Sequence, residues 1–246
     1  MQAPRLEMGD GLREYMAKAD ETAKDLLLAD HKLVKALTVY DEYFRRGLWR
    51  QAHLTPSLGF ILFLNSYQMF LAATRTALSG HPVATLPLLR TAIESAAYGF
   101  LIEQEPELAS IWINRHKSDS AKRACRNAFT FEKAITGLKD KAPDIYQLAK
   151  EAYEASIDYG AHPNPKGVIG HVSIDEARSD GLVAIVHTSL YGAEHIETNR
   201  GLCGCLDIGL AIIGIIVASR NDITEAQVAE LQELSDAKNA ATSDLS

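Results

Sequence analysis

Three ionisable residues at four-residue intervals are the first candidates for chemistry in this sequence. Arg90, Glu94 and Tyr98 would share one face of a helix. Between positions 51 and 102 the chain has only three formal charges, where its average of 23% charged residues predicts about 12. A charge in so apolar a helix is costly unless it is paired or used. The pattern predicts either an ion pair that fixes helix packing or a polar pocket wall, in which Arg90 binds an anion and Glu94 orients it.

A second candidate is the loop that follows Asp158. The segment from 159 to 167, YGAHPNPKG, contains two prolines and two glycines, which favour a stiff loop of defined shape. Loops of this content often carry function, and here we expect the His162 ring to point towards the helix of Arg90. The alternative is a rigid connector whose side chains satisfy backbone groups. The functional interpretation gives these ligand-binding residues: Arg90, Glu94, Tyr98, Asp158, His162 and Asn164.

The remaining reactive side chains do not form a recognisable catalytic or metal-binding motif. Histidines at positions 162, 171, 187 and 195 show no H-x-x-H or H-E-x-x-H spacing, so we expect no metal site. Three cysteines are too few, and odd in number, for a disulfide framework. The glycine motifs of phosphate loops, dinucleotide sites and nucleophile elbows are absent from the sequence. We therefore expect no cofactor.

Charge is distributed unevenly along the chain. From 115 to 126 five Lys or Arg residues face only Asp119, and a helix would place Lys122, Arg123 and Arg126 on one side. Such a face is either solvated or a weak, salt-sensitive contact for RNA. Residues 161 to 246 carry 5 basic and 12 acidic side chains, which accounts for the whole net charge of −7. This acidic final third argues against duplex DNA as a partner.

Helices must position these residues over most of the chain. Apolar residues recur at three- and four-residue steps from 11 to 28 and from 31 to 46. Caps, prolines and Gly80 predict further helices over 55–80, from Pro82 or Pro87 to 103, and over 106–112, 118–135, 143–158, 191–220 and 222–236. We expect an all-α, irregular multi-helix bundle with one small β-hairpin at about 167–187. It would form a single domain over 1–236, followed by a flexible tail at 237–246.

Two apolar stretches approach the length of a membrane span. The segment 57–74 contains Asn65, Ser66 and Gln68, and the segment 202–219 contains Asp207 and three glycines. Neither has the strongly basic flank that sets orientation in a membrane. We expect core helices and no membrane partner; the alternative for 202–219 is a membrane-associated or dimer-forming helix. The N-terminus has no apolar signal core, and the few cysteines suit a reducing compartment, so we expect a cytoplasmic protein.

Two short motifs give the sequence a family resemblance. LLRTAIE at 88–94 and YGAHPNP at 159–165 look like uncharacterised bacterial helical proteins that combine an L-L-R-x-x-x-E helix with a His-Pro loop. This resemblance covers roughly 80 to 165 and implies an all-α fold without an established activity. The chain is also loosely similar in texture to the HEPN superfamily of helical bundles, some of which are ribonucleases with an Arg and a His four to six residues apart. Arg75 and His81 have that spacing, although the segment between them contains Ser79-Gly80, where the predicted helix ends.

Two functions of different classes follow. The first is a soluble helical ligand- or partner-binding protein that self-associates and takes an anionic small ligand in a polar pocket around Arg90, Glu94 and the His162 loop. The alternative is a HEPN-like, metal-independent ribonuclease of a defence or toxin system, with a His as acid and base and an Arg as phosphate clamp. A cleft beside Arg90 favours the first, and an Arg–His pair opening onto the basic face favours the second.

Overall fold

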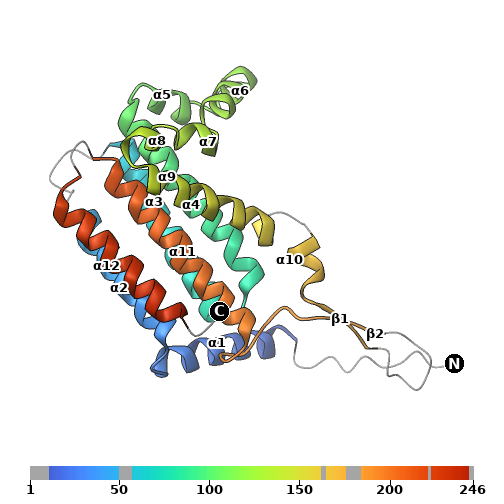
Figure 1. Ribbon diagram of the computed structural model, residues 1–246. Helices are drawn as coiled ribbons and strands as arrows, with labels where there is room; N and C mark the ends of the chain where they lie inside the picture. Colours follow the sequence, from blue (N-terminus) through green and yellow to red (C-terminus); the bar gives the residue numbers. More distant parts are fainter. Residues whose placement is uncertain (1–10, 50–56, 162–164, 176–183, 221–222, 244–246) are drawn as a thin grey trace.

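The computed structural model describes residues 11–49, 57–161, 165–175, 184–220 and 223–243. Twelve α-helices, one π-helical turn and two short strands lie in these ranges, which confirms the predicted all-α bundle with one small hairpin. Helices α3 (Leu58–Leu78), α4 (Pro82–Gln104) and α11 (Ile196–Ala218) lie side by side at the centre (Figure 1). The segment 51–102 carries few charges because it supplies α3 and most of α4, two of the three core helices.

The contact between α3 and α4 depends on a close approach of two glycines. A Cβ atom on Gly99 would lie 2.9 Å from the carbonyl oxygen of Gly59 and 2.6 Å from the ring of Phe63. Helix α4 begins at Pro82, the earlier of the two predicted starts, and continues through Pro87. Pro82 suits the first turn because its missing N–H would have no helical partner there.

Three further helices cover this core. Helix α2 (Lys32–Trp49) and helix α12 (Glu225–Thr242) pack together on one side, and α1 (Leu12–Leu28) crosses one end of the bundle (Figure 1). The buried Tyr40 hydroxyl of α2 donates to the Leu234 carbonyl of α12 at 3.2 Å. Helix α12 continues past the end predicted at 236 to Thr242, and Ala241 is only 8% exposed; the flexibility of 237–246 stays a prediction.

Four short helices form a cap at the opposite end of the bundle: α5 (Leu108–Ile113), α6 (Asp119–Ala128), α7 (Phe131–Ala134) and α8 (Leu138–Lys141). The single helix expected over 118–135 is thus divided in two. Phe129 turns inward, with 7% exposure, and Thr130 starts α7 by accepting the Lys133 N–H on its hydroxyl at 3.4 Å. A buried aromatic residue followed by a threonine cap ends one helix and begins the next.

The segment after the cap leads to a projecting arm. Helix α9 (Pro143–Ser156) continues into the π-helical turn η1 (Ile157–Ala161), and then α10 (Pro165–Ile169) precedes β1 (Val172–Asp175) and β2 (Ala184–His187). The strands are antiparallel, with Ile174 opposite Ile185. The predicted hairpin therefore begins at 172 and not at 167, because Pro165 opens a turn of helix there. Together α10 and the hairpin form an arm that extends from the bundle (Figure 1).

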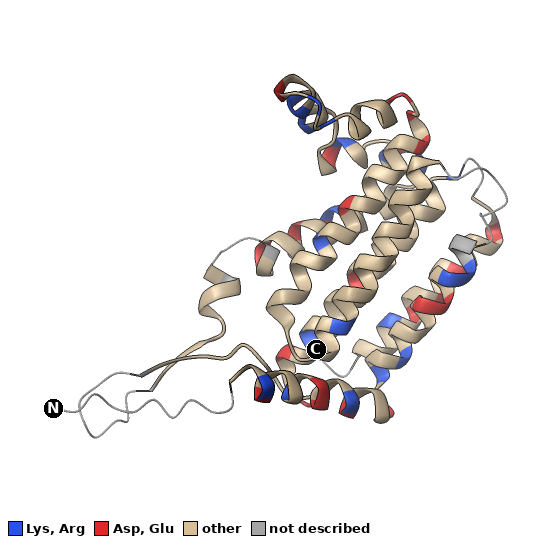
Figure 2. Ribbon diagram, turned by 180° about the vertical axis from the view of Figure 1, so that it is seen from behind, with Lys and Arg blue, Asp and Glu red and all other residues tan. Residues whose placement is uncertain are grey.

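Helix α11 is the one helix among the described residues that is long and apolar enough to cross a membrane; its most apolar stretch of 18 residues has a mean hydropathy of 2.3. Within the protein, 83% of its most apolar window is buried. Figure 2 shows Lys, Arg, Asp and Glu gathered on the outer helices and largely absent from the three central ones. The expectation of a core helix over 202–219 agrees with this burial.

Candidate functional site

Arg90 and Glu94 contact each other, as their spacing predicts. The Arg90 Nε donates to Glu94 Oε1 at 3.0 Å, and both side chains are largely covered, at 22% and 25% exposure. A third residue completes the arrangement: Arg90 Nη2 donates to the Tyr153 hydroxyl at 3.1 Å, and that hydroxyl donates to Glu94 Oε1 at 3.0 Å. Arg90, Glu94 and Tyr153, which we call the Arg90 clamp, join α4 to α9.

Packing around the clamp is dense. The Phe131 ring stacks on Tyr153 with centroids 3.8 Å apart and planes 9° from parallel. The Arg90 guanidinium carbon lies 5.4 Å from the centre of the Tyr153 ring. Burial, and then the neighbouring Glu94 carboxylate, raise the pKa of the Tyr153 phenol, so this hydroxyl stays a hydrogen-bond donor at neutral pH. The clamp has the features of an internal brace between two helices.

The other predicted site residues have different positions. The Tyr98 hydroxyl donates to the Phe129 carbonyl at 3.2 Å, and its pKa is raised, first by burial and then by Glu94. Asp158 lies exposed in η1. His162 and Asn164 fall outside the described residues, so the predicted direction of the His162 ring stays a prediction.

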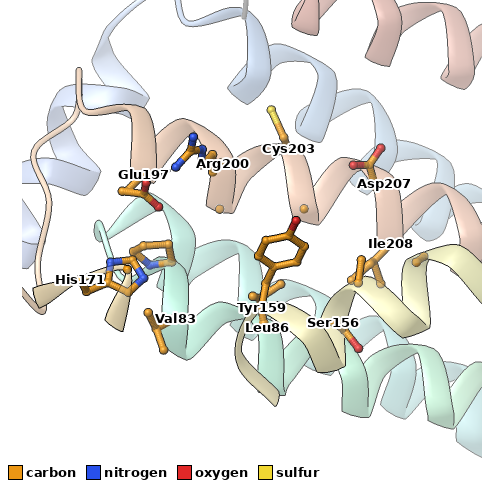
Figure 3. Close-up of a pocket in the computed structure, with 16 residues that line it drawn as sticks. Val83, Leu86, Ser156, Tyr159, His171, Glu197, Arg200, Cys203, Asp207 and Ile208 are labelled. Carbon is orange, nitrogen blue, oxygen red and sulfur yellow. Dashed lines mark hydrogen bonds and ion pairs between the residues drawn. The ribbon is translucent and has the colours of Figure 1, made fainter. Parts of the chain in front are cut away.

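A cavity of about 520 Å³ lies one helical turn from the clamp. Its walls are the start of α4, the end of α9 with η1, the residues after α10, and the first half of α11 (Figure 3). Leu86 lines it four residues before Arg90, and Ala152 lines it next to Tyr153. Arg90, Glu94 and Tyr98 do not line it. The clamp therefore joins two of the helices, α4 and α9, that line the cavity.

The polar groups of the cavity come mainly from α11 and from the start of the hairpin. Arg200 forms an ion pair with Glu197 on the same face of α11, and its side chain is 67% exposed (Figure 3). The His171 Nδ1 lies 2.6 Å from the hydroxyl of Tyr191, which fixes the orientation of the imidazole. Next to it, the His195 ring packs on Tyr191 at 4.5 Å and accepts the Glu197 N–H, so that His195 caps α11.

Cys203 is the thiol of this cavity. Burial, reinforced by the Asp207 carboxylate, raises its pKa to about 11, so the thiol is protonated at neutral pH. Asp207 also lines the cavity and forms an ion pair with Lys238 of α12 at 2.9 Å. A protonated thiol is a weak nucleophile, so Cys203 contributes a polarisable wall and not a reactive centre.

Small residues in the first half of α11 leave room for the cavity. Gly201 and Gly204 both line it, and a Cβ atom on Gly204 would find only Leu86 and Leu89 at 3.8 Å. Sequence reasoning missed this site: Glu197, Arg200 and Gly201 were not candidates, Cys203 was considered only as one of the three cysteines, and Gly204 and Asp207 were noted only as features of an apolar stretch. The available signal was the combination of a Glu-x-x-Arg pair with a Gly-x-x-Gly spacing at the start of one helix.

The residues behind the other predictions lie elsewhere. Arg75 and His81 sit at the turn between α3 and α4, and both contact α1: Arg75 pairs with Asp20 at 2.5 Å, and His81 Nε2 lies 2.6 Å from the Tyr15 hydroxyl. Burial lowers the pKa of His81. Among the described residues, no three His, Cys, Asp or Glu side chains gather closely enough to hold a metal ion.

Comparison with known proteins adds no assignment. No family model, no curated protein and no solved structure matches this chain.

Proposed function

We propose that this protein binds a small amphipathic anion in the cavity between α4, α9 with η1, and α11. The supporting observation is one concave site that combines an apolar floor with a charged rim. Its volume of about 520 Å³ lies within the range of about 300–1,000 Å³ that small-molecule sites occupy. Tyr159 and Gly170, which stand before and after the His162 loop in the chain, both line the site.

The floor of the cavity suits an apolar group. Val83 and Leu86 from α4, Ala152 from α9 and Ile208 from α11 present aliphatic surface to it. Covering such surface contributes roughly 25 cal/mol for each Å² removed from water. A ligand with a flat or short aliphatic body would therefore gain most of its binding free energy here.

The rim suits a carboxylate, sulfonate or phosphate group. Arg200 is 67% exposed and uses one side of its guanidinium for Glu197, so donors remain for a second anion. His171 is oriented by Tyr191 and lies on the same rim (Figure 3). Binding an anion at Arg200 adds charge-assisted hydrogen bonds without burying an unpaired charge.

An amphipathic anion with intrinsic fluorescence tests the proposal. We expect 1-anilinonaphthalene-8-sulfonate to bind at one saturable site, with stoichiometry set by calorimetry. Gly204→Leu fills the cavity and should weaken this binding at least about tenfold, whereas Gly192→Leu, at an open position with nothing within 4 Å of its Cβ, should not. Arg200→Gln should weaken binding of the sulfonate more than binding of an uncharged naphthalene. Unchanged affinity in both Gly204→Leu and Arg200→Gln would refute the assignment.

We also propose that the protein acts in the cytoplasm and self-associates. Cys125, Cys203 and Cys205 are all free thiols, which suits a reducing compartment.

The exposed apolar surface of the arm supports self-association. The arm exposes Ile169, Ile174 and Ile185 by 61–72%, and a lone two-stranded hairpin is marginally stable in water unless something covers it. Light scattering should show a dimer or larger assembly that Ile174→Lys dissociates; a monomer at all concentrations would exclude self-association.

A further inference from the structure

Helices α5 and α6 and the turn between them form a strongly cationic tip. Residues 108–128, which we call the basic tip, contain five Lys or Arg residues and one acidic residue, a net charge of +4. The whole chain carries −7, so the remainder carries −11. The one acid, Asp119, lies in the first turn of α6, where it complements the helix dipole. Glu105 and Glu107 precede α5, while the basic residues follow it.

The basic residues of the tip are exposed, and no carboxylate neutralises them in the described part of the chain. No ion pair is found at any of these positions: Arg115, Lys117, Lys122, Arg123 and Arg126. Elsewhere Arg45, Arg75 and Arg90 each meet an acid within 3.0 Å. On α6 the buried Cys125 faces the protein, so Lys122, Arg123 and Arg126 face outwards. An uncompensated cluster of this kind is free to attract an anionic partner.

The position of the basic tip in the fold restricts the shape of an anionic partner. The basic tip lies at the extreme end of the molecule, away from α1 and the arm (Figures 1 and 2). A flat surface can reach it without approaching α1 or the arm. Ile113, at the end of α5, is 62% exposed and adds one apolar side chain beside the charges, next to the half-buried Trp112.

We propose that the basic tip docks the protein on an anionic lipid membrane surface. Each Lys or Arg near such a surface strengthens binding about fivefold, and the attraction falls off within a Debye length. The acidic remainder is repelled, so the molecule is oriented with the tip towards the lipid headgroups. Ile113 can enter the interface between headgroups and acyl chains, where an aliphatic side chain is stabilised. The contact is peripheral and leaves the buried α11 in the core.

The surface chemistry of the tip favours lipid over single-stranded nucleic acid. Sites for single strands combine a basic groove with aromatic rings on which bases stack. The aromatic residues beside the tip are Trp112, which is half-buried, and Phe129, which is 7% exposed. In the described part of the chain, neither the cavity beside α11 nor a second one between α4, α5 and α7 is lined by a basic residue of the tip.

Flotation with lipid vesicles tests the proposal on the full-length chain. We expect binding to vesicles of phosphatidylcholine with about 30% phosphatidylserine, none to pure phosphatidylcholine, and loss of binding as salt rises above about 0.15 M. The triple variant Lys122→Gln, Arg123→Gln and Arg126→Gln should bind anionic vesicles at least about fiftyfold more weakly. Ile113→Ser should produce a smaller loss that added salt does not change.

The matched control removes the same charge at the other end of the bundle. Arg13, Lys18 and Lys24 are exposed on α1, and their triple Gln variant should keep full vesicle binding. Circular dichroism should show all variants folded, because every changed side chain is exposed. Equal losses in the two triple variants, or equal binding to neutral and anionic vesicles, would overturn the proposal. Tighter binding to a labelled oligouridylate of about 20 nucleotides than to anionic vesicles would reassign the tip to nucleic acid.

Discussion

Arg90 and Arg200 each pair with a glutamate on their own helix, yet the two pairs differ in their surroundings. The Arg90–Glu94 pair of α4 is covered by Tyr153, which bonds both partners, and its side chains are 22% and 25% exposed. The Glu197–Arg200 pair of α11 borders the cavity, and Arg200 is 67% exposed. An Arg–Glu pair thus braces two helices where a third residue closes it, and stays exposed where a cavity opens beside it.

The two pairs also show why an apolar context is an ambiguous signal. Arg90 is conspicuous because its neighbours are uncharged, but those neighbours are uncharged because α4 is a core helix. A charge in that setting needs an internal partner, whatever else it does. Arg200 lies in the first turns of α11, where charge is ordinary, and so does not stand out in the sequence.

The largest expected effect is the loss of the clamp. Arg90→Leu leaves Glu94 without its cation between two helices. We therefore expect the free energy of unfolding, measured with urea, to fall by about 2–3 kcal/mol. Arg200→Leu removes an exposed pair and should change the free energy of unfolding by less than about 1 kcal/mol. The double variant Arg90→Leu with Glu94→Leu should recover part of the loss, because no charge is then stranded. Equal small effects at Arg90 and Arg200 would abolish the distinction between the two pairs.

The second prediction concerns the thiol of the cavity. With its pKa raised to about 11 from 9.0, Cys203 holds about a hundredfold less thiolate near neutral pH than an ordinary cysteine. Alkylation by iodoacetamide should be slowed by a similar factor and should speed up as pH rises towards 11. Cys203→Ser identifies the signal, since Cys125 and Cys205 are buried. Rapid alkylation of Cys203 at pH 7 would mean that the cavity does not desolvate the thiol.

A smaller effect isolates the hydroxyl that closes the clamp. Tyr153→Phe keeps the ring that stacks on Phe131 and removes only the group shared by Arg90 and Glu94. We expect a loss of about 1 kcal/mol in the free energy of unfolding. Tyr146→Phe is the control, because that hydroxyl bonds the exposed Glu132 and should matter less. If both variants unfold alike, the clamp owes its stability to the ion pair alone.

Local signals in the sequence predicted most of the helices. The apolar stretches 57–74 and 202–219 were predicted to be core helices, and they lie in α3 and α11; the helix predicted from 222 is α12, which Thr224 caps. The division of the helix near Phe129 was missed, because burial of that ring depends on α4 and not on local propensity.

The site was predicted only in part. The Arg90–Glu94 contact lies within one helix, so its spacing specified it, whereas Tyr153 approaches from α9 and no periodicity indicates it. A cavity is the space that remains between elements far apart in the chain, here lined by Leu86, Ser156 and Arg200 among others. Its size follows from how helices pack, and a single sequence specifies that only through residues such as Gly204 that keep the space open.

The smallest effect distinguishes that open space from the core along one helix. Gly204 faces the cavity, where a new Cβ would make ordinary contacts at 3.8 Å, so Gly204→Ala should stabilise α11 by about 0.5–1 kcal/mol through helix propensity. Gly209, five residues further on, has no such room: its Cβ would lie 2.8 Å from Phe70 and 3.0 Å from Tyr40. There the same change should destabilise the protein, because crowding in a packed core outweighs the helical gain. Thermal unfolding of the two variants distinguishes these cases. A rise in stability for Gly204→Ala together with a fall for Gly209→Ala would locate the cavity beside Gly204. A fall at both positions would mean that the first half of α11 is packed as tightly as the second.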